Sequence, residues 1–546
     1  MPRDLSAVES AQDRDEGRRF TRRTALALLG AGGIAAAASG PASASHGGGG
    51  GTQTWTQNRN ADEHDLLNLH ALDAEHVFTP ARTPDRVVWK DGNGTFHADG
   101  PDGEIANGGD VIDVAQAAVN SLTAGRDWKE TVAVVSPGTV GPTDSSHELV
   151  LPSYTVLDAP TTITVDDSDP LEVIPVKARD ADHVEVRNLT VRGAPEYTMV
   201  FNSVSNLRLE NIAVEHQPSG AGTGIRIDGN GGSGERSADI QAERIYGENV
   251  DSHLFETRRV DRVQVDQVVA RNVSGCTVLL NETADATVSD VIEYSPNPPN
   301  ETDYATFRTT YQQGRVAVDN VVSHQADRGL HLHTGSGELV INNVYIDSPR
   351  GRGAVMSGPP NTVLDGGVIK NCDGKAIDLY TISDPETEPE RRADGVKLTN
   401  LRIYDDRSES NRTQTHAIAE AGNAQNNQFV DNDVRDGGTD ALIETASPTT
   451  VVRDNVAAGV AEGTVTLTSG SSPAAWVDGV SGRGTVTLDL RAKPVTAPGS
   501  AFAYDHDFRW DGSEWDLVVE WVDDPGHDVD LDYIVDRPQA NIGREP

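Results

Sequence analysis

Short apolar blocks separated by polar positions recur along most of the chain. The first ones have the form apolar-x-Asn-apolar-x-apolar and occupy residues 186–191 and 209–214. Their asparagines, Asn188 and Asn211, lie 23 residues apart. A base period of 23–24 residues, lengthened at some points by insertions, indicates a solenoid of stacked repeats. The later blocks are centred on Arg244, Gln267, Asp290, Asn320, Asn343, Gly367, Asn400, Asn432 and Asn455.

Each block is followed by a second segment in which apolar and polar residues alternate. An alternation with period two marks a strand with one buried face. Strands that repeat at this spacing, with no helix between them, fit a parallel β-helix whose turns stack about 4.8 Å apart. We expect the recurring asparagine at a corner of each turn, in a left-handed backbone conformation. The second segments include residues 197–201, 224–228, 276–280, 329–333, 376–380 and 463–467.

The residues before the repeats predict how the solenoid begins. Asp110 can cap an amphipathic helix over residues 111–122, and Gly125 can stop it. Two strands, 131–138 with its Pro-Gly end and 149–157, follow this helix. The order is a helix, a strand, a Pro-Gly turn and a second strand.

With these features the chain resembles the pectate-lyase-like superfamily of right-handed β-helices, over about residues 104–500. The resemblance implies an all-β, right-handed parallel β-helix over residues 110–500, made of single-strand turns with an N-terminal capping helix. It also implies a saccharide groove along one sheet and its loops. We expect cap segments at 52–109 and 501–546, the latter with a β-hairpin turning at Asp511-Gly512.

The N-terminal segment has the pattern of an export signal over residues 1–44. An apolar run, 25–38, follows Arg22-Arg23 and precedes the small-residue site Ala42-Ser43-Ala44. The paired arginines look like those of the twin-arginine route, so we expect that export machinery as a partner and a secreted or cell-surface location. A Gly-rich spacer, 45–51, follows. No later stretch has ~18 consecutive apolar residues, so no membrane span is expected.

Charge limits the partners of this protein. The chain holds 85 acidic and 45 basic side chains, for a net charge of −40. Such a field repels phosphates, which excludes a nucleic-acid partner. The acids are dispersed, as in proteins of salt-loving archaea, and at 1 M salt the Debye length of about 3 Å screens their mutual repulsion. The sequence does not indicate an oligomeric state.

The two cysteines test the repeat assignment. Cys276 and Cys372 fall four turns apart in the alignment of the repeats. Four turns separate them by about 19 Å, far more than the ~7 Å that a disulfide spans. Both are therefore expected to be free thiols.

Candidate chemistry lies at the outward positions of the second segments. With Leu330 and Leu332 turned toward the core, His331 and His333 project together to the outside. Two histidines on one face of one strand suit proton transfer. Further candidates in the turns before and after are Arg226, Asp228, Arg308, Arg328, Lys375, Asp378 and Tyr380.

These residue types match the needs of β-elimination from a uronic acid polymer. The reaction needs a base for the C5 proton, a cation near the carboxylate and an acid for the leaving oxygen. His331 or His333 can be the base, Arg308 or Lys375 the cation, and Tyr380 the acid. Asp378 is a further catalytic candidate, and we expect Arg226, Asp228 and Arg328 to bind substrate.

Two alternatives remain open. A glycoside hydrolase needs two carboxyl groups about 5–9.5 Å apart, and Asp378 could pair with Asp405 or Asp406. A non-catalytic glycan-binding protein could use the same face. The W-x-D-H and R-x-P-x-x-R patterns of pectate lyases and the G-H-G and R-I-K patterns of polygalacturonases do not occur, so no catalytic residue transfers by motif. No cofactor is specified. Ca²⁺ is the one metal left open, and the acidic residues 523–532 lack EF-hand spacing.

Overall fold

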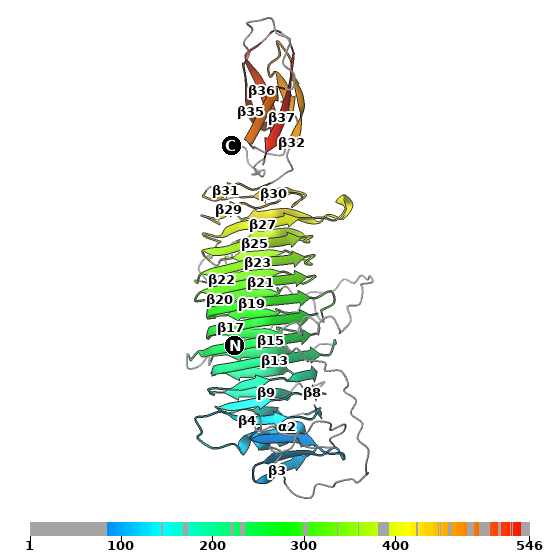
Figure 1. Ribbon diagram of the computed structural model, residues 1–546, viewed down its shortest axis with the longest axis vertical. Helices are drawn as coiled ribbons and strands as arrows, with labels where there is room; N and C mark the ends of the chain where they lie inside the picture. Colours follow the sequence, from blue (N-terminus) through cyan, green and yellow to red (C-terminus); the bar gives the residue numbers. More distant parts are fainter. Residues whose placement is uncertain are drawn as a thin grey trace, which may run out of the picture. The chain divides into compact units, whose positions relative to one another are not determined.

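The computed structural model shows a parallel β-helix followed by antiparallel sheets (Figure 1). Residues 1–83, which include the predicted export signal and spacer, and residues 537–546 lie outside the described part. The structure describes residues 84–536 apart from gaps at 144–145, 167–172, 219–221, 230–234, 299–303, 336, 359, 381–392, 422–423, 446, 448, 457–460, 478–484, 491–502, 511–514, 525 and 527.

One wall of the solenoid is a 12-stranded parallel sheet in which each strand comes from a successive turn. This sheet confirms the predicted stacking of the second segments. Its strands are β6 (His147–Val150), β9 (Val173–Arg179), β12 (Tyr197–Asn202), β14 (Thr223–Asp228), β16 (Phe255–Arg258), β18 (Val278–Asn281), β20 (Phe307–Gln312), β22 (Leu330–Gly335), β24 (Ala354–Ser357), β26 (Gly374–Leu379), β28 (Gln414–Glu420) and β30 (Ala441–Glu444).

The remaining walls form a 19-stranded sheet that turns around the solenoid. Its longest strands continue through a corner of the solenoid and stay paired with the strands of the neighbouring turns. Its strands are β1 (Arg86–Lys90), β2 (Phe96–Gly100), β3 (Gly103–Gly108), β4 (Glu130–Val134), β5 (Gly138–Val140), β7 (Thr155–Asp158), β8 (Thr162–Val165), β10 (Glu185–Arg187), β11 (Thr190–Gly193), β13 (Ser205–His216), β15 (Ser237–Glu248), β17 (Val260–Arg271), β19 (Ala284–Tyr294), β21 (Val316–His324), β23 (Leu339–Asp347), β25 (Thr362–Lys370), β27 (Lys397–Tyr404), β29 (Gln428–Val430) and β31 (Val451–Arg453).

The recurring asparagine lies at this corner, as predicted. Asn211, Asn320 and Asn343 have φ angles of 56°, 58° and 56°, in the left-handed region that asparagine tolerates better than most residues. The Asn211 amide also donates a hydrogen bond of 2.9 Å to Asn188 in the preceding turn. The corners therefore stack as the repeat spacing requires.

The last two turns depart from the predicted register by one residue. Their corner residues are Asp431 and Asp454, with φ angles of 59° and 57°. Asn432 and Asn455 therefore point into the core instead of occupying the corner, and both are buried. The Asn432 side chain accepts a hydrogen bond from the Leu401 backbone at 3.1 Å, so an internal amide replaces an apolar residue there.

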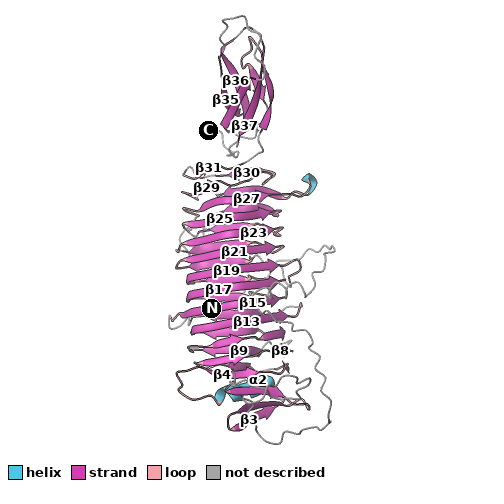
Figure 2. Ribbon diagram, in the orientation of Figure 1, coloured by secondary structure: helices cyan, strands magenta, loops and turns pink. Residues whose placement is uncertain are grey.

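A short helix, α2 (Val111–Asn120), covers the first turn, as predicted (Figure 2). The Asp110 carboxylate accepts hydrogen bonds from the backbone N–H groups of Ile112 and Asp113 and so caps the helix. The helix ends at Asn120, two residues before the predicted end at residue 122, and the Ser121 N–H caps it by bonding the last helical carbonyls. Before it, β1, β2 and β3 pair antiparallel.

The solenoid ends earlier than expected. The last parallel bridge joins Asp433 to Val456. Residues 463–467, predicted as a further turn, lie instead in β32 (Ala461–Leu467), which pairs antiparallel with β37 (Val529–Asp536). β34 (Thr485–Leu490) pairs with the other side of β37. The prediction of a β-helix to residue 500 is therefore wrong, because period-two alternation does not distinguish parallel from antiparallel strands.

A second three-stranded sheet contains the predicted hairpin. β35 (Ala503–Trp510) pairs antiparallel with β36 (Trp515–Asp523), up to the pair Trp510–Trp515. β33 (Ala475–Val477) pairs with the other side of β36. The predicted turn at Asp511-Gly512 lies outside the described residues and stays a prediction, whereas the strands on either side of it do pair.

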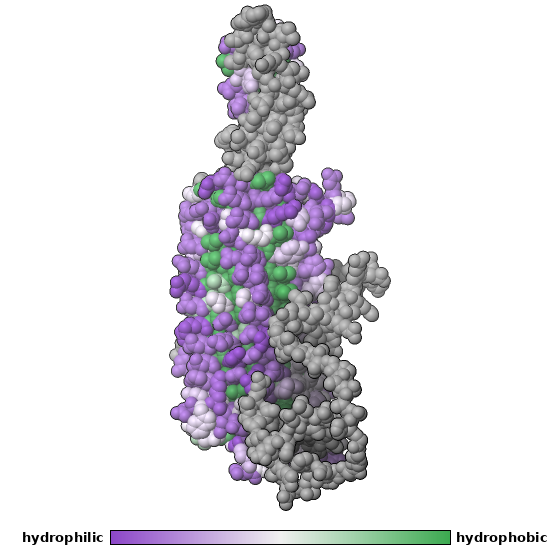
Figure 3. Space-filling view, viewed as in Figure 1, coloured by the Kyte–Doolittle hydropathy of each residue, from purple (hydrophilic) through white to green (hydrophobic). Residues whose placement is uncertain are grey.

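Two further expectations hold. Cys276 and Cys372 are free and buried, which agrees with their four-turn separation. No helix among the described residues is long and apolar enough to cross a membrane. Most of the described surface on the face drawn in Figure 3 is hydrophilic, with a green, apolar band along the stacked strands. Val340 and Tyr345 of β23 are exposed.

The internal asparagine gives a test of the fold. We expect Asn432→Ala to lower the free energy of unfolding by about 2–4 kcal/mol, because it leaves buried backbone groups without partners and opens a cavity. Asn400→Ala, at an exposed corner, should cost only about 1 kcal/mol. Urea unfolding followed by circular dichroism measures both. Equal losses would contradict the internal role of Asn432.

Candidate functional site

The candidate site lies on the outward face of the 12-stranded sheet. The strand register there aligns side chains from successive turns into two columns. The first column consists of Arg226, Glu256, Leu279, Arg308, His331, Val355 and Asp378. The second column consists of Asp228, Arg258, Asn281, Thr310, His333 and Ser357.

The inward residues confirm the predicted face. Leu330 and Leu332 on either side of His331 are fully buried, as are Phe307 and Ile377 in neighbouring strands. Because strand side chains alternate, the polar residues between them must face outward. The nine predicted site residues do lie on this face or at its edge.

His331 is packed tightly among cations. Its side chain is only 6% exposed, and its Nδ1 lies 3.3 Å from a guanidinium nitrogen of Arg328. A guanidinium can only donate, so Nδ1 accepts and Nε2 carries the proton. Burial, together with Arg308 and Arg328, lowers the pKa of His331 to about 2. The ring is therefore neutral, and its Nε2–H is a donor.

That donor and a donor of Arg308 both lack acceptors. His331 Nε2 and Arg308 Nε are buried and have no hydrogen-bond partner among the described residues. The two residues lie directly opposite each other on β20 and β22. The Arg308 guanidinium also lies 5.1 Å from the centre of the Tyr304 ring. Two adjacent donors without acceptors suit a ligand oxygen.

His333 completes this group on the more exposed side. Its ring centre lies 5.4 Å from that of His331, and its Nδ1 lies 3.2 Å from the Ser357 hydroxyl. The edge of Tyr311 contacts it at a centroid distance of 6.3 Å. His333 is half-buried, so it is the more accessible of the two rings for proton transfer.

Two turns further on, Asp378 is already satisfied. It is 4% exposed and forms ion pairs with Arg352 at 3.0 Å and Lys375 at 3.1 Å. Tyr380 is half-buried, and the Arg352 guanidinium lies 5.9 Å from its ring centre. Lys375 is thus committed to Asp378, so of the two predicted cations Arg308 is the one with an unused donor.

Four turns before the histidines, a second cluster surrounds Arg226. Its guanidinium bonds Asp228 at 3.2 Å and approaches Glu256 at 3.7 Å. Arg259 also bonds Asp228, at 2.8 Å. Burial raises the pKa of Glu256. Glu256 did not emerge as a candidate from the sequence, although aligning it with Arg226 by turn would have placed it outward.

His253 is a further buried imidazole that sequence reasoning missed. Its Nδ1 accepts the Cys276 backbone N–H at 2.9 Å, and its ring meets Tyr304 edge-on at 4.9 Å. Burial, with Arg308 and Arg226 nearby, lowers the pKa of His253 to about 3. It lies just before a strand, where no alternation marks it.

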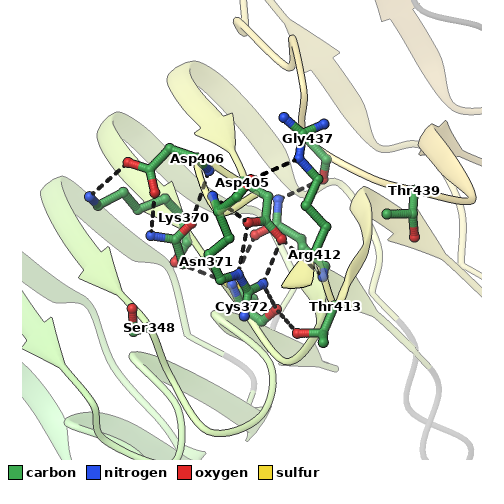
Figure 4. A network of polar contacts seen from close by, with 12 residues as sticks. Ser348, Lys370, Asn371, Cys372, Asp405, Asp406, Arg412, Thr413, Gly437 and Thr439 are labelled. Atoms are coloured by element: carbon green, nitrogen blue, oxygen red, sulfur yellow. Dashed lines mark hydrogen bonds and ion pairs between the residues drawn. The ribbon is translucent and has the colours of Figure 1, made fainter. Parts of the chain in front are cut away.

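The hydrolase alternative needs a second carboxylate to act with Asp378, and neither Asp405 nor Asp406 is available for this. Figure 4 shows Asp405 and Asp406 inside a network that holds the loop after β27. Asp405 is 1% exposed and bonds the Arg407 guanidinium through both oxygens, which helps to keep the pKa of Asp405 low. Asp406 accepts from Lys370 and Asn371. Both carboxylates are structural, so neither serves Asp378.

Two hollows and one possible ligand group lie elsewhere. A hollow of about 600 Å³ lies beside Arg208 and Gln241, and one of about 500 Å³ beside Tyr404.

Asp110, Asp113 and His147 bring ligand atoms together, but the Asp110 carboxylate already caps α2. Among the acidic residues at 523–532, Asp524 and Asp528 accept hydrogen bonds from the loop at 469–470. A Ca²⁺ site remains a prediction.

The comparisons with known proteins identify no family for this chain. No protein-family model and no curated protein matches the chain. Among solved structures, the A-modules of the Azotobacter vinelandii mannuronan C-5 epimerases AlgE4 and AlgE6 are each 12% identical, with TM-scores of 0.48 and 0.40. They cover 63% and 64% of this chain, and 96% of each module is matched.

A tailspike protein of E. coli bacteriophage HK620, solved with a pentasaccharide, is 10% identical with a TM-score of 0.42. It covers 78% of this chain, and 90% of that chain is matched. All three TM-scores are below 0.5, so it is the strand pairing of this chain itself that establishes a parallel β-solenoid. Similarity at this level assigns it no reaction.

The buried neutral imidazoles predict acid sensitivity. His253 and His331 have folded pKa values of about 3 and about 2, against about 6.5 unfolded. At pH values between the folded and the unfolded pKa, the unfolded chain binds more protons than the folded chain. The free energy of unfolding therefore falls as pH falls below about 6.5. Each should contribute a loss of about 1–2 kcal/mol between about pH 7 and pH 5. Urea unfolding across this range measures the slope.

The matched variants isolate this contribution. His253→Asn and His331→Gln should flatten the slope, whereas His506→Gln, at an exposed position, should not change it. An unchanged slope in both buried-site variants would show that these rings do not titrate as proposed.

Proposed function

We propose that the protein is an exported polysaccharide lyase that cleaves an acidic polysaccharide by β-elimination on the outward face of the 12-stranded sheet. One observation carries the proposal: Arg308 Nε and His331 Nε2 are adjacent, buried donors without acceptors. In a chain of net charge −40, a face with Arg308, Arg328 and Arg352 around an imidazole suits an anion. A uronate carboxylate supplies both the charge and the two acceptor oxygens.

The reaction distributes over four side chains. Arg308 and His331 bind the carboxylate and stabilise the charge that builds up when the neighbouring C5–H bond breaks. His333 takes that proton, the electron pair forms the C4–C5 double bond, and the C4–O bond breaks. Tyr380 gives a proton to the leaving oxygen. His331 therefore acts as a donor and not as the base, since Nδ1 already accepts from Arg328.

The other site residues bind the remainder of the chain. Arg226 and Asp228 lie on the same face four turns away and can bond sugar hydroxyls. Arg328 holds the tautomer of His331. Arg308 supplies the positive charge that Ca²⁺ would otherwise supply, so this mechanism does not need the metal. Export rests on the signal pattern within residues 1–44.

Polysaccharide digestion tests the reaction. The protein is incubated at molar salt, with Ca²⁺ or with EDTA, against acidic and neutral polysaccharides. We expect ultraviolet absorbance of unsaturated uronate ends and reducing ends to rise together, with acidic polymers only and in both metal conditions. Arg308→Gln should lower kcat/KM about 10²–10³-fold, and His333→Gln about 10²–10⁴-fold. Arg208→Gln, on β13 outside the site, is the control.

Other outcomes would change the assignment. Reducing ends without ultraviolet absorbance would replace the lyase by a hydrolase. No product from the folded protein would favour a glycan-binding protein that uses the same face.

A further inference from the structure

Unpaired polar atoms extend beyond the two donors of the proposed reaction site. Arg258 Nε, Asn281 Oδ1, Arg308 Nε and His331 Nε2 are buried and lack hydrogen-bond partners among the described residues. They lie on β16, β18, β20 and β22, four successive strands of the 12-stranded sheet. We call these four residues the unpaired strip.

Such a run is unusual, because about nine in ten buried polar groups are hydrogen-bonded. Each unpaired group destabilises the folded protein unless something else satisfies it. The Glu282 carboxylate lies 4.0 Å from Arg258 Nε, which makes an ion pair and not a hydrogen bond. On either side of the strip, by contrast, Asp228 and Asp378 each bond two cationic side chains.

The strip alternates in charge from turn to turn. β16 contributes the cation Arg258, and β20 contributes the cation Arg308. Between them, β18 turns only Leu279 and Asn281 outward, and neither is charged. Turns lie about 4.8 Å apart, so the two guanidinium groups belong to turns about 10 Å apart and the strip spans about 14 Å along the solenoid axis. It crosses from the second column, which holds Arg258 and Asn281, to the first column, which holds Arg308 and His331.

A linear glycan fits this arrangement. A pyranose unit extends about as far as one turn, about 4.8 Å, so a chain along the solenoid axis passes one unit over each strand. Its acid groups then meet Arg258 and Arg308 on alternate units. A hydroxyl or amide of the intervening unit donates to Asn281, and its apolar face rests on Leu279. Burial raises the pKa of Glu256, the nearby first-column acid, which favours its uncharged form beside an anionic ligand.

We infer that the unpaired strip binds a linear acidic glycan of three to four units that presents a carboxylate to this face on every second unit. The inference rests on the proposed polysaccharide site but not on cleavage. It assigns Arg258, Asn281 and Leu279 to ligand binding and gives the site a minimum ligand length. A single uronic acid satisfies only the Arg308–His331 end.

Calorimetric titration with defined oligosaccharides tests the strip. The probes are glucuronic acid, hyaluronan oligosaccharides of two, four and six units, in which acid and neutral sugars alternate, and neutral malto-oligosaccharides. We expect the hyaluronan tetrasaccharide to bind about ten- to a hundredfold more tightly than glucuronic acid, with little further gain for six units. Malto-oligosaccharides should bind at least tenfold more weakly than the tetrasaccharide.

The variants separate the two ends of the strip. Arg258→Gln should weaken the tetrasaccharide about tenfold or more and leave glucuronic acid unchanged. Arg308→Gln should weaken both ligands. Arg271→Gln is a matched control, because Arg271 Nε is also buried and unpaired but lies on β17 of the other sheet. Its affinities should equal those of the unmodified protein, and circular dichroism checks that each variant is folded.

The inference and the proposed reaction fail separately. If binding depends on ligand length and on Arg258 but no cleavage occurs, the inference about the unpaired strip is supported and the lyase proposal is contradicted. If neither cleavage nor binding changes with Arg258→Gln or with ligand length, the inference about the unpaired strip is wrong. The lyase proposal is then decided by the digestion experiment alone. Equal affinity for malto-oligosaccharides and hyaluronan would also overturn it.

Discussion

The register of the stacked parallel strands determines nearly everything else in this protein. Backbone N–H groups bond carbonyls of the next turn at some positions, as from Asn188 to Glu210, and of the preceding turn at others, as from Ala213 to Leu189. A residue on one strand therefore has a fixed neighbour above and below. A slip by one residue would turn Leu330 and Leu332 outward and His331 inward. The left-handed corner residues, such as Asn211 and Asn343, keep this register by giving every turn the same bend.

The same register makes the candidate site. A catalytic group in a solenoid is not assembled from distant loops but from equivalent positions of adjacent turns. Arg308 and His331 are 23 residues apart and yet lie directly opposite each other. Because the backbone ladder is already satisfied, these side chains can stay buried with unpaired donors only if a ligand or solvent completes them. The fold therefore bears the free-energy cost of holding these donors in place for a ligand.

The sequence predicts the repeating part of this structure well and its exceptions poorly. The apolar period identifies the parallel turns, the outward histidines and the capped helix, because each follows from local spacing. It cannot distinguish the antiparallel strand at 463–467 from a further turn, since both alternate alike. It also misplaces Asn432 by one residue, where an internal amide replaces an apolar side chain. Glu256 was missed because burial and partners depend on neighbouring turns.

The protonation of His331 shows why residue type alone does not assign a role. A histidine pair on a strand suggests a base, yet only the structure shows that Arg328 already occupies Nδ1. Once that nitrogen accepts, the other must donate, and the surrounding arginines prevent a second proton. In the proposed reaction the base is therefore His333, which is more exposed than His331. Under this proposal an electrostatic constraint, and not sequence pattern, separates the two imidazoles into a carboxylate-binding group and a proton acceptor.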